Sequence, residues 1–197
     1  MKRMMLPVVL ASVMATPAFA EGMDKKFYVG VNLATGSGTE TVTTETEEYE
    51  FDLSAGSTRF ALGYVTSDQG RIEVSYGGYS IEFDGADEEE EITSLDFDGY
   101  YLFGEGDIRG YVTGGFGFAT YQDTAQYVEG DSDLRGISFQ FGGGLVFSVA
   151  ENVELDGSLR IKGIGWQPIE ASDGYSTSDV QRGTGLTMFG IGAKVLF

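Results

Sequence analysis

Thr184-Gly185-Leu186-Thr187-Met188-Phe189-Gly190-Ile191-Gly192-Ala193-Lys194-Val195-Leu196-Phe197 closes the chain. Every second residue counted back from Phe197 to Phe189 is apolar, and the positions between them are mostly small or polar, apart from Leu196 and Met188. Such alternation indicates a strand with two different faces. In a soluble domain a bare apolar last strand is an edge that invites aggregation. A closed barrel in a membrane removes that edge and places the apolar face against lipid.

The composition agrees with a protein made of strands. The chain has 197 residues, enough for one domain, with 30 glycines, 13% aromatic residues and only 3 prolines. It holds 12 basic and 31 acidic residues and no histidine, for a net charge of -19. This acidity argues against a nucleic-acid partner, because phosphate binding needs Lys and Arg. Cysteine is absent, which excludes disulfides and thiolate chemistry.

The first twenty residues read as a signal peptide. Lys2 and Arg3 precede an apolar core over 4–15, and Ala18-Phe19-Ala20 is a small-x-small cleavage pattern. We therefore expect cleavage between Ala20 and Glu21, with a signal peptide over 1–20 and a barrel domain over 21–197. The mature chain keeps ten basic residues against 31 acidic ones, a net charge of -21. No later segment has the ~18 apolar residues of a membrane helix. The exported chain is then periplasmic, secreted or an outer-membrane barrel.

Eight segments alternate like strands. They span 26–34, 57–66, 71–83, 95–103, 108–121, 137–149, 153–162 and 184–197. A slip of the apolar phase at Gly77-Gly78, after which Tyr79, Ile81 and Phe83 form the apolar set, predicts a β-bulge in the third strand. The first, third, fifth and seventh connections are long and polar, over 35–56, 84–94, 122–134 and 163–183. The first of them has the spacing of a weak hairpin that extends its flanking strands. The other three connections are tight turns.

This pattern predicts an all-β fold, an eight-stranded antiparallel up-and-down transmembrane β-barrel. Short turns on one side and long loops on the other are typical of outer-membrane barrels, with the turns in the periplasm. Both termini then lie on the periplasmic side. We expect two aromatic belts at the lipid headgroups. The periplasmic belt would hold Phe27, Tyr28, Tyr64, Tyr101, Phe103, Phe147 and Phe197, and the outer belt Tyr79, Phe83, Phe118, Tyr121 and Trp166.

From Phe27 to Phe197 the chain resembles the small eight-stranded outer-membrane barrels of the OmpA/OmpX type, with the loose porin family and opacity-type proteins. The resemblance rests on the strand number, the loop asymmetry, the signal peptide and the terminal Phe197. It implies location in the bacterial outer membrane, among membrane lipid and lipopolysaccharide. It also implies that Phe197 belongs to the signal read by the outer-membrane assembly machinery. The chain stops at Phe197, so the peptidoglycan-binding domain that follows the barrel in OmpA is not implied.

A soluble, lipocalin-like barrel is the alternative fold, with an apolar inside and a polar outside. The apolar face carries large residues at nearly every step, which is more than a small interior holds. The polar face carries glycines and charges of both signs. We expect these charges to form a paired network in the lumen, because buried charges need partners. They are Arg59, Arg71, Glu73, Asp96, Asp98, Glu154, Asp156, Arg160, Lys162 and Lys194.

Two carboxylate pairs, Asp96 with Asp98 and Glu154 with Asp156, are candidates for acid–base chemistry. Residues two apart on a strand lie ~6.5–7 Å apart on one face. Any polar lumen produces this spacing, however, and we interpret the pairs as structural. Without histidine the chain has no Ser-His-Asp triad and no His-based zinc site. Enzymes built on outer-membrane barrels, such as the lipid A deacylase, use a catalytic histidine, so their mechanism is excluded. We expect no cofactor.

The acidic run Glu88 to Glu91 offers carboxylate oxygens to divalent cations. It lacks the spacing of an EF-hand loop, so a solvated, repelling loop is the favoured interpretation. Eight strands leave an interior just large enough for side chains, although the inward glycines leave room for a narrow passage. The sequence thus predicts a non-enzymatic barrel that supports the envelope or contacts partners through its loops. The alternative is a narrow OmpW-like channel for small or apolar solutes.

Overall fold

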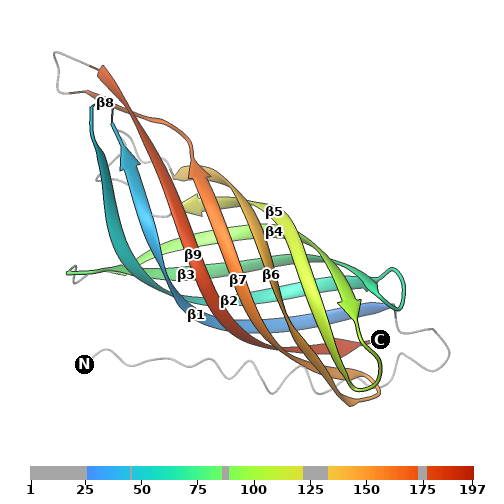
Figure 1. Cartoon of the computed structure of the whole chain (residues 1–197). Helices are drawn as coiled ribbons and strands as arrows, with labels where there is room; N and C mark the ends of the chain where they lie inside the picture. The colour runs from blue at the N-terminus through green and yellow to red at the C-terminus, as the bar shows by residue number, and fades with distance from the viewer. Residues whose placement is uncertain (1–25, 45, 86–88, 122–132, 173–176) are drawn as a thin grey trace.

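The computed structural model describes residues 26–44, 46–85, 89–121, 133–172 and 177–197, which form one antiparallel barrel (Figure 1). Neighbouring strands pair in the order β1-β2-β3-β4-β5-β6-β7-β9, and pairing of β1 with β9 closes the barrel. This confirms the predicted eight-stranded fold. Within these residues, no helix is long and apolar enough to cross a membrane. The strands are β1 (Phe27–Thr43), β2 (Glu48–Val65), β3 (Gly70–Phe83), β4 (Glu89–Phe103), β5 (Ile108–Tyr121), β6 (Leu134–Ala150), β7 (Val153–Trp166), β8 (Ile169–Ser172) and β9 (Thr177–Leu196).

The two ends of the barrel differ in their connections. At one end, the turn end, short connections join β2 to β3, β4 to β5 and β6 to β7. Gly104 and Gly106 have φ of 94° and 82° in the β4–β5 turn, a conformation that glycine adopts without strain. The last residue also lies here, where Phe27 and Phe197 exchange backbone hydrogen bonds of 3.1 and 2.9 Å. The opposite end is the loop end.

The strands run further toward the loop end than the sequence predicted. Most of 35–56 is strand, so that β1 reaches Thr43 and β2 begins at Glu48, as the hairpin spacing suggested. The prediction of a loop over 163–183 was also wrong, because most of these residues belong to β7, β8 and β9. Residues Glu89 to Ser94 belong to β4, and of the expected loop 122–134 residues 122–132 lie outside the described residues. In Figure 1 the loop ends of β9, β1 and β2 extend beyond those of β5 and β6.

The predicted bulge at Gly77-Gly78 was wrong. The pairing of β3 with β2 and with β4 runs through both glycines in a single register. Tyr79 and Ile81 therefore stay on the inward set that begins with Arg71, and they are only 3% and 0% exposed. The apolar pattern changes phase because the inside of the barrel changes from polar to apolar along the strand.

That change divides the barrel into two halves. In the lower half, which is the part next to the turn end, large apolar side chains point outward. On each barrel strand, the outward apolar residue nearest the loop end marks the upper limit of this half. These residues are Leu33, Phe60, Tyr76, Leu95, Phe118, Ile137, Ile161 and Phe189. In the upper half, the next outward positions are Thr35, Thr58, Gly78, Thr93, Thr120, Arg135, Gly163 and Thr187. The inside of the upper half is a buried apolar core of Leu53, Ala55, Tyr79, Ile81, Ile92, Ala119, Tyr121, Leu134, Ile164, Trp166, Leu186 and Met188.

The predicted membership of the two aromatic belts was wrong in part. Tyr79, Tyr121 and Trp166 were expected on the outside near the loop end, but all three are buried in the upper core. Of that set Phe118 is exposed, at 54%, and Phe83 is partly buried. At the turn end, Tyr28 is fully buried inside the barrel. The other predicted members of the lower belt lie on the outside, where the ring of Phe27 is 5.0 Å from that of Tyr64.

Candidate functional site

All ten predicted lumen charges point into the barrel, and nine of them are at most 7% exposed. The tenth, Arg160, has a side chain that is 12% exposed. Together with Arg109 they form ion pairs that extend from the turn end to the border of the upper core. We call this set the lumen network. It contains five carboxylates and six cations, so its charges nearly balance, and the large acidic excess of the chain lies elsewhere.

At the turn end the network begins with one carboxylate held by two arginines. Arg71 donates to both oxygens of Glu154, at 2.6 and 2.9 Å, which is the bidentate geometry of a strong guanidinium–carboxylate pair. Arg109 donates to Oε1 of Glu154 at 3.0 Å. Arg71 is 5% exposed and Glu154 is 4% exposed. The lumen at the turn end therefore holds a buried bidentate ion pair with a second arginine beside it.

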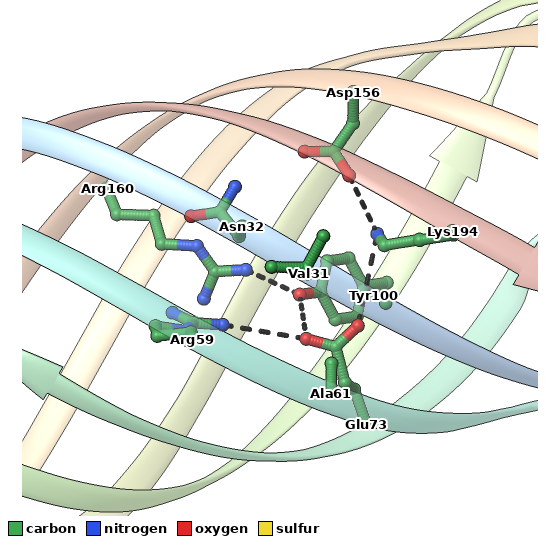
Figure 2. Close-up of a pocket in the computed structure, with 10 residues that line it drawn as sticks. Val31, Asn32, Arg59, Ala61, Glu73, Tyr100, Asp156, Arg160 and Lys194 are labelled. Carbon is green, nitrogen blue, oxygen red and sulfur yellow. Dashed lines mark hydrogen bonds and ion pairs between the residues drawn. The ribbon is translucent and has the colours of Figure 1, made fainter. Parts of the chain in front are cut away.

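The centre of the network is Glu73. Its two oxygens accept hydrogen bonds from the hydroxyls of Tyr28 and Tyr100, at 2.9 and 2.8 Å. Arg59 and Lys194 lie 3.5 and 3.9 Å from the same carboxylate. Figure 2 shows three of these groups, from Arg59, Tyr100 and Lys194, converging on Glu73 from different strands. A buried carboxylate with this many donors is compensated for its lost hydration.

Two further carboxylates complete the centre. Asp98 accepts from the Gln140 amide at 2.6 Å and from Arg160 at 3.1 Å, with Arg59 3.7 Å away. Asp156 pairs with Lys194 at 3.2 Å, the contact drawn at the top of Figure 2. Arg59 and Lys194 thus each reach two carboxylates, which joins the pairs into one connected cluster.

The network ends at Lys162, beside the upper core. Its ammonium group donates to both oxygens of Asp96, at 2.6 and 2.8 Å, and to Ser94 at 2.8 Å. Lys162 also lies 3.4 Å from the hydroxyl of Tyr79, whose ring belongs to the upper core. Lys162 is 2% exposed and Asp96 1% exposed. Tyr79 therefore marks the level at which the lumen changes from polar to apolar.

Glycines make room for these large side chains. A Cβ atom added to Gly115 would lie 2.3 Å from Oδ1 of Asp98, and one added to Gly63 would lie 1.9 Å from the ring of Tyr28. The same relation holds for other cross-strand pairs: Gly117 with Asp96, Gly142 with Arg160, Gly192 with Asp156 and Gly77 with Arg59. The inward glycines were expected to leave room for a narrow passage, but at these positions a side chain of the neighbouring strand covers the glycine.

A smaller polar group lies at the loop end of the upper core. Arg182 donates to the carboxylate of Glu40, and its guanidinium lies 5.2 Å from the ring centre of Tyr121. Trp166 donates from its indole nitrogen to the hydroxyl of Thr184 at 2.8 Å. Glu40 is 2% exposed. The apolar core is thus bounded on both sides by buried ion pairs.

The carboxylate pairs considered for catalysis do not act as pairs. Asp96 is held by Lys162, whereas Asp98 is held by Arg160 and Gln140. Glu154 and Asp156 likewise have different partners. The cavity beside Glu73 has a volume of about 10 Å³, room for about one water molecule. Each carboxylate is therefore occupied by a cation of the protein itself, which leaves little space for a substrate.

Other predicted sites are placed only in part. Ala20, Glu21 and Glu88 lie outside the described residues. Glu89 and Glu91 are exposed on the outer face of β4, and Glu90 is partly buried on its inner face. Within the part of the chain that the structure describes, no group of three acidic residues has the arrangement of a metal site. Phe197 is exposed at the turn end and stacks on Phe27 at 6.4 Å between ring centres.

Several residues of the lumen were not among the predicted charges. Glu40 and Arg182 fell in stretches that were read as loops, and Arg109 follows a tight turn closely. Tyr100 lies on an inward position two residues from Asp98, and Gln140 lies on the polar face expected for its strand but was not counted in the network. The period-two pattern places Tyr100, Gln140 and Arg109 inside within the predicted strands, and it reaches Glu40 and Arg182 once it is continued beyond the predicted strand ends.

Comparisons with known proteins agree with this architecture. The family model described as "Outer membrane protein beta-barrel domain" matches residues 6–194. Neisserial surface protein A is 19% identical, with a TM-score of 0.55 over 87% of this chain and 97% of its own. The outer membrane protein AlkL in DMPC bilayers is 17% identical, with a TM-score of 0.52 over 92% and 95%. E. coli outer membrane protein W is 13% identical, with a TM-score of 0.48 over 89% and 100%. No curated protein matches the sequence.

Proposed function

The chain belongs to the outer membrane protein β-barrel family, and from this premise we propose that it is a non-enzymatic, non-conducting barrel that presents a contact surface outside the cell. In this proposal the turn end and both termini face the periplasm, and the loop end faces outward, as in barrels of this kind. The outward apolar side chains of the lower half then meet membrane lipid. The upper half stands among lipopolysaccharide and beyond it.

The observation that carries this proposal is that, in the part of the chain that the structure describes, side chains occupy the lumen of both halves. The lower half is occupied by the lumen network, with a cavity of about 10 Å³ beside Glu73. The upper half is occupied by twelve buried apolar residues. An ion would have to break buried ion pairs and then cross an apolar core without water, which is costly. This supports a rigid support for surface contacts more than a pore.

The buried carboxylates support a non-enzymatic role. Asp96 and Asp98 each face a cation or amide of the protein at 2.6 Å. The chain contains no histidine to act as a general base near neutral pH. Single replacement of Asp96, Asp98, Glu154 or Asp156 is expected to lower the free energy of unfolding. None of these replacements is expected to abolish an enzymatic activity.

Phe197 supports a link to the outer-membrane assembly machinery. It is exposed at the end of β9 and contacts Phe27, at the seam where the barrel closes. Deletion of Phe197 is expected to reduce the amount of assembled barrel in cells. The purified, refolded variant should keep nearly its full stability, because an exposed terminal ring buries little area. Normal assembly of the deletion variant would contradict this role.

Conductance across a planar bilayer tests the main proposal. We expect no current steps above background over a range of voltages, and a shift in gel mobility on heating that shows a folded barrel. A folded barrel with steady conductance would overturn the proposal. A protein that stays in the soluble periplasmic fraction would overturn membrane location itself.

A narrow channel for small apolar solutes is the second candidate. The apolar core of the upper half favours it, since this part of the lumen is compatible with apolar molecules and not with ions. Uptake of a small alkane into vesicles that contain the barrel decides between the two candidates. Uptake that is lost when Leu186 is replaced by Trp would support the channel, and uptake equal to that of empty vesicles would remove it.

A further inference from the structure

Among the described residues, one strand of the upper half has an edge without a neighbouring strand. β2 begins at Glu48, but its neighbour β3 ends at Phe83, which pairs with Leu53. The last backbone contact between these strands is the hydrogen bond from Asp84 N–H to the carbonyl of Asp52, at 3.1 Å. Residues 48–51 therefore have β1 on one side, through the pairs Thr43↔Glu48 to Glu40↔Phe51, and none of the described strands on the other.

The backbone groups on this open side can be assigned. In an antiparallel sheet the N–H and C=O of one residue point to the same neighbour, and successive residues alternate between neighbours. Because the carbonyl of Asp52 points toward β3, those of Glu50 and Glu48 point to the same side. No described strand pairs with these groups, which follow one another at the spacing of a strand. The loop end of β9, by contrast, has a neighbouring strand, because β8 pairs with it from Ile169↔Val180 onward.

The side chains of the open edge form two contrasting faces. Tyr49 and Phe51 lie on the inner face and are 47% and 48% exposed, beyond the top of the apolar core. Glu48, Glu50 and Asp52 lie on the outer face and are exposed. An exposed strand edge with large apolar side chains readily takes up another strand. Because acidic and aromatic residues alternate on this edge, an added strand would match it with alternating basic and apolar side chains.

We propose that this edge of β2 binds an extended peptide segment in which basic and apolar residues alternate. The segment adds as a strand beside Glu48–Phe51, with its apolar side chains on Tyr49 and Phe51 and its basic side chains beside Glu48 and Glu50. A second copy of the barrel fits poorly, because pairing two such edges places glutamates opposite glutamates. The inference rests on the proposed role as a surface-contact barrel and names the chemistry of its partner.

The probe is a synthetic ten-residue peptide of alternating Lys and Val, with binding followed by fluorescence anisotropy. The purified full-length barrel is held in nanodiscs of zwitterionic phospholipid, so that no anionic lipid competes. We expect saturable binding that weakens at least about tenfold when alternate peptide N–H groups are methylated, since each such group loses a backbone hydrogen bond. A peptide of the same composition with the Lys and Val residues in two blocks should bind as weakly as the methylated one.

Two pairs of variants separate strand addition from general attraction to an acidic surface. Glu50→Pro removes the N–H that faces the open side and spares the pairing with β1, whereas Glu50→Ala removes only the charge. We expect the proline variant to bind several-fold more weakly than the alanine variant. Glu48→Gln with Glu50→Gln should weaken binding about tenfold, and the matched change of Glu89 and Glu91 on β4 should leave it unchanged.

Equal loss in both double variants, or equal binding of the methylated peptide, would overturn the inference. The heat-dependent gel shift of every variant confirms that the barrel is folded. A folded, non-conducting barrel that fails to bind the peptide keeps the proposed function and loses only this inference.

Discussion

The lower and upper halves of this barrel are built from the same strands with opposite polarity. In the lower half, Phe141 points outward at 65% exposure while Asp98 is 3% exposed inside. In the upper half, Thr187 is outside and Ile81 is fully buried inside. Hydrogen bonding is continuous across the border, so the backbone does not mark it. What differs is the surrounding solvent, since apolar groups face lipid in one half and avoid water in the other.

The largest effect is expected from breaking the polar inside of the lower half. Asp98→Ala takes away the carboxylate that pairs with Arg160, and it leaves Arg59 with Glu73 alone. Loss of one partner of a buried ion pair costs about 3–5 kcal/mol. Urea unfolding of the refolded protein in phospholipid vesicles measures this loss in the free energy of unfolding. The control Asp52→Ala removes an exposed acid of the upper half, and its effect should lie within about 0.5 kcal/mol.

A charge on the outer surface tests the same border from the outside. Phe141→Arg places a cation where the lower half meets lipid, which costs about 2–4 kcal/mol near the middle of a bilayer. Thr39→Arg places the same side chain on the outer face of the upper half, where water surrounds it, and should cost close to nothing. Folding yield into phospholipid vesicles and urea unfolding report both. Equal destabilisation by the two variants would show that the border is misplaced.

Glycines on the two faces of the lower half provide a smaller contrast. An added Cβ at Gly115 meets Oδ1 of Asp98 at 2.3 Å and the backbone oxygen of Phe97 at 2.2 Å, while one at Gly157 meets nothing within 4 Å. We expect Gly115→Ala to cost about 1–3 kcal/mol through overpacking. Gly157→Ala should change stability by less than about 0.5 kcal/mol. If Gly115→Ala proves neutral, the lumen is more loosely packed than the contacts indicate.

The smallest effect concerns the border inside the lumen. Tyr79→Phe keeps the ring in the upper core and removes the hydroxyl 3.4 Å from Lys162. Lys162 retains Asp96 and Ser94, so the expected cost is about 0.5–1.5 kcal/mol, the value of one hydrogen bond. Ile81→Ser, one step further into the apolar core, should cost more because it buries an unpaired hydroxyl. Urea unfolding of the two variants side by side gives the comparison.

The ten lumen charges and the eight strands followed from local alternation. Each of Asp96, Asp98, Arg160 and Lys162 alternates with outward apolar residues, so a period of two was enough to place them inside. The upper half was misread for the same reason. Tyr79 and Ile81 are apolar, and the rule that apolar residues face lipid sent them outward, which required a bulge that does not exist.

The sequence by itself determined a closed barrel, its inward charges and the end at which the short turns lie. These features depend on the period of side chains along one strand and on turn residues. Only the tertiary structure decided which cation meets which carboxylate, that Gly63 lies under Tyr28, and where polarity reverses. Those depend on the register between strands distant in the chain and on how far each strand rises above the lipid. Register and height are properties of the closed barrel, and no single strand carries them.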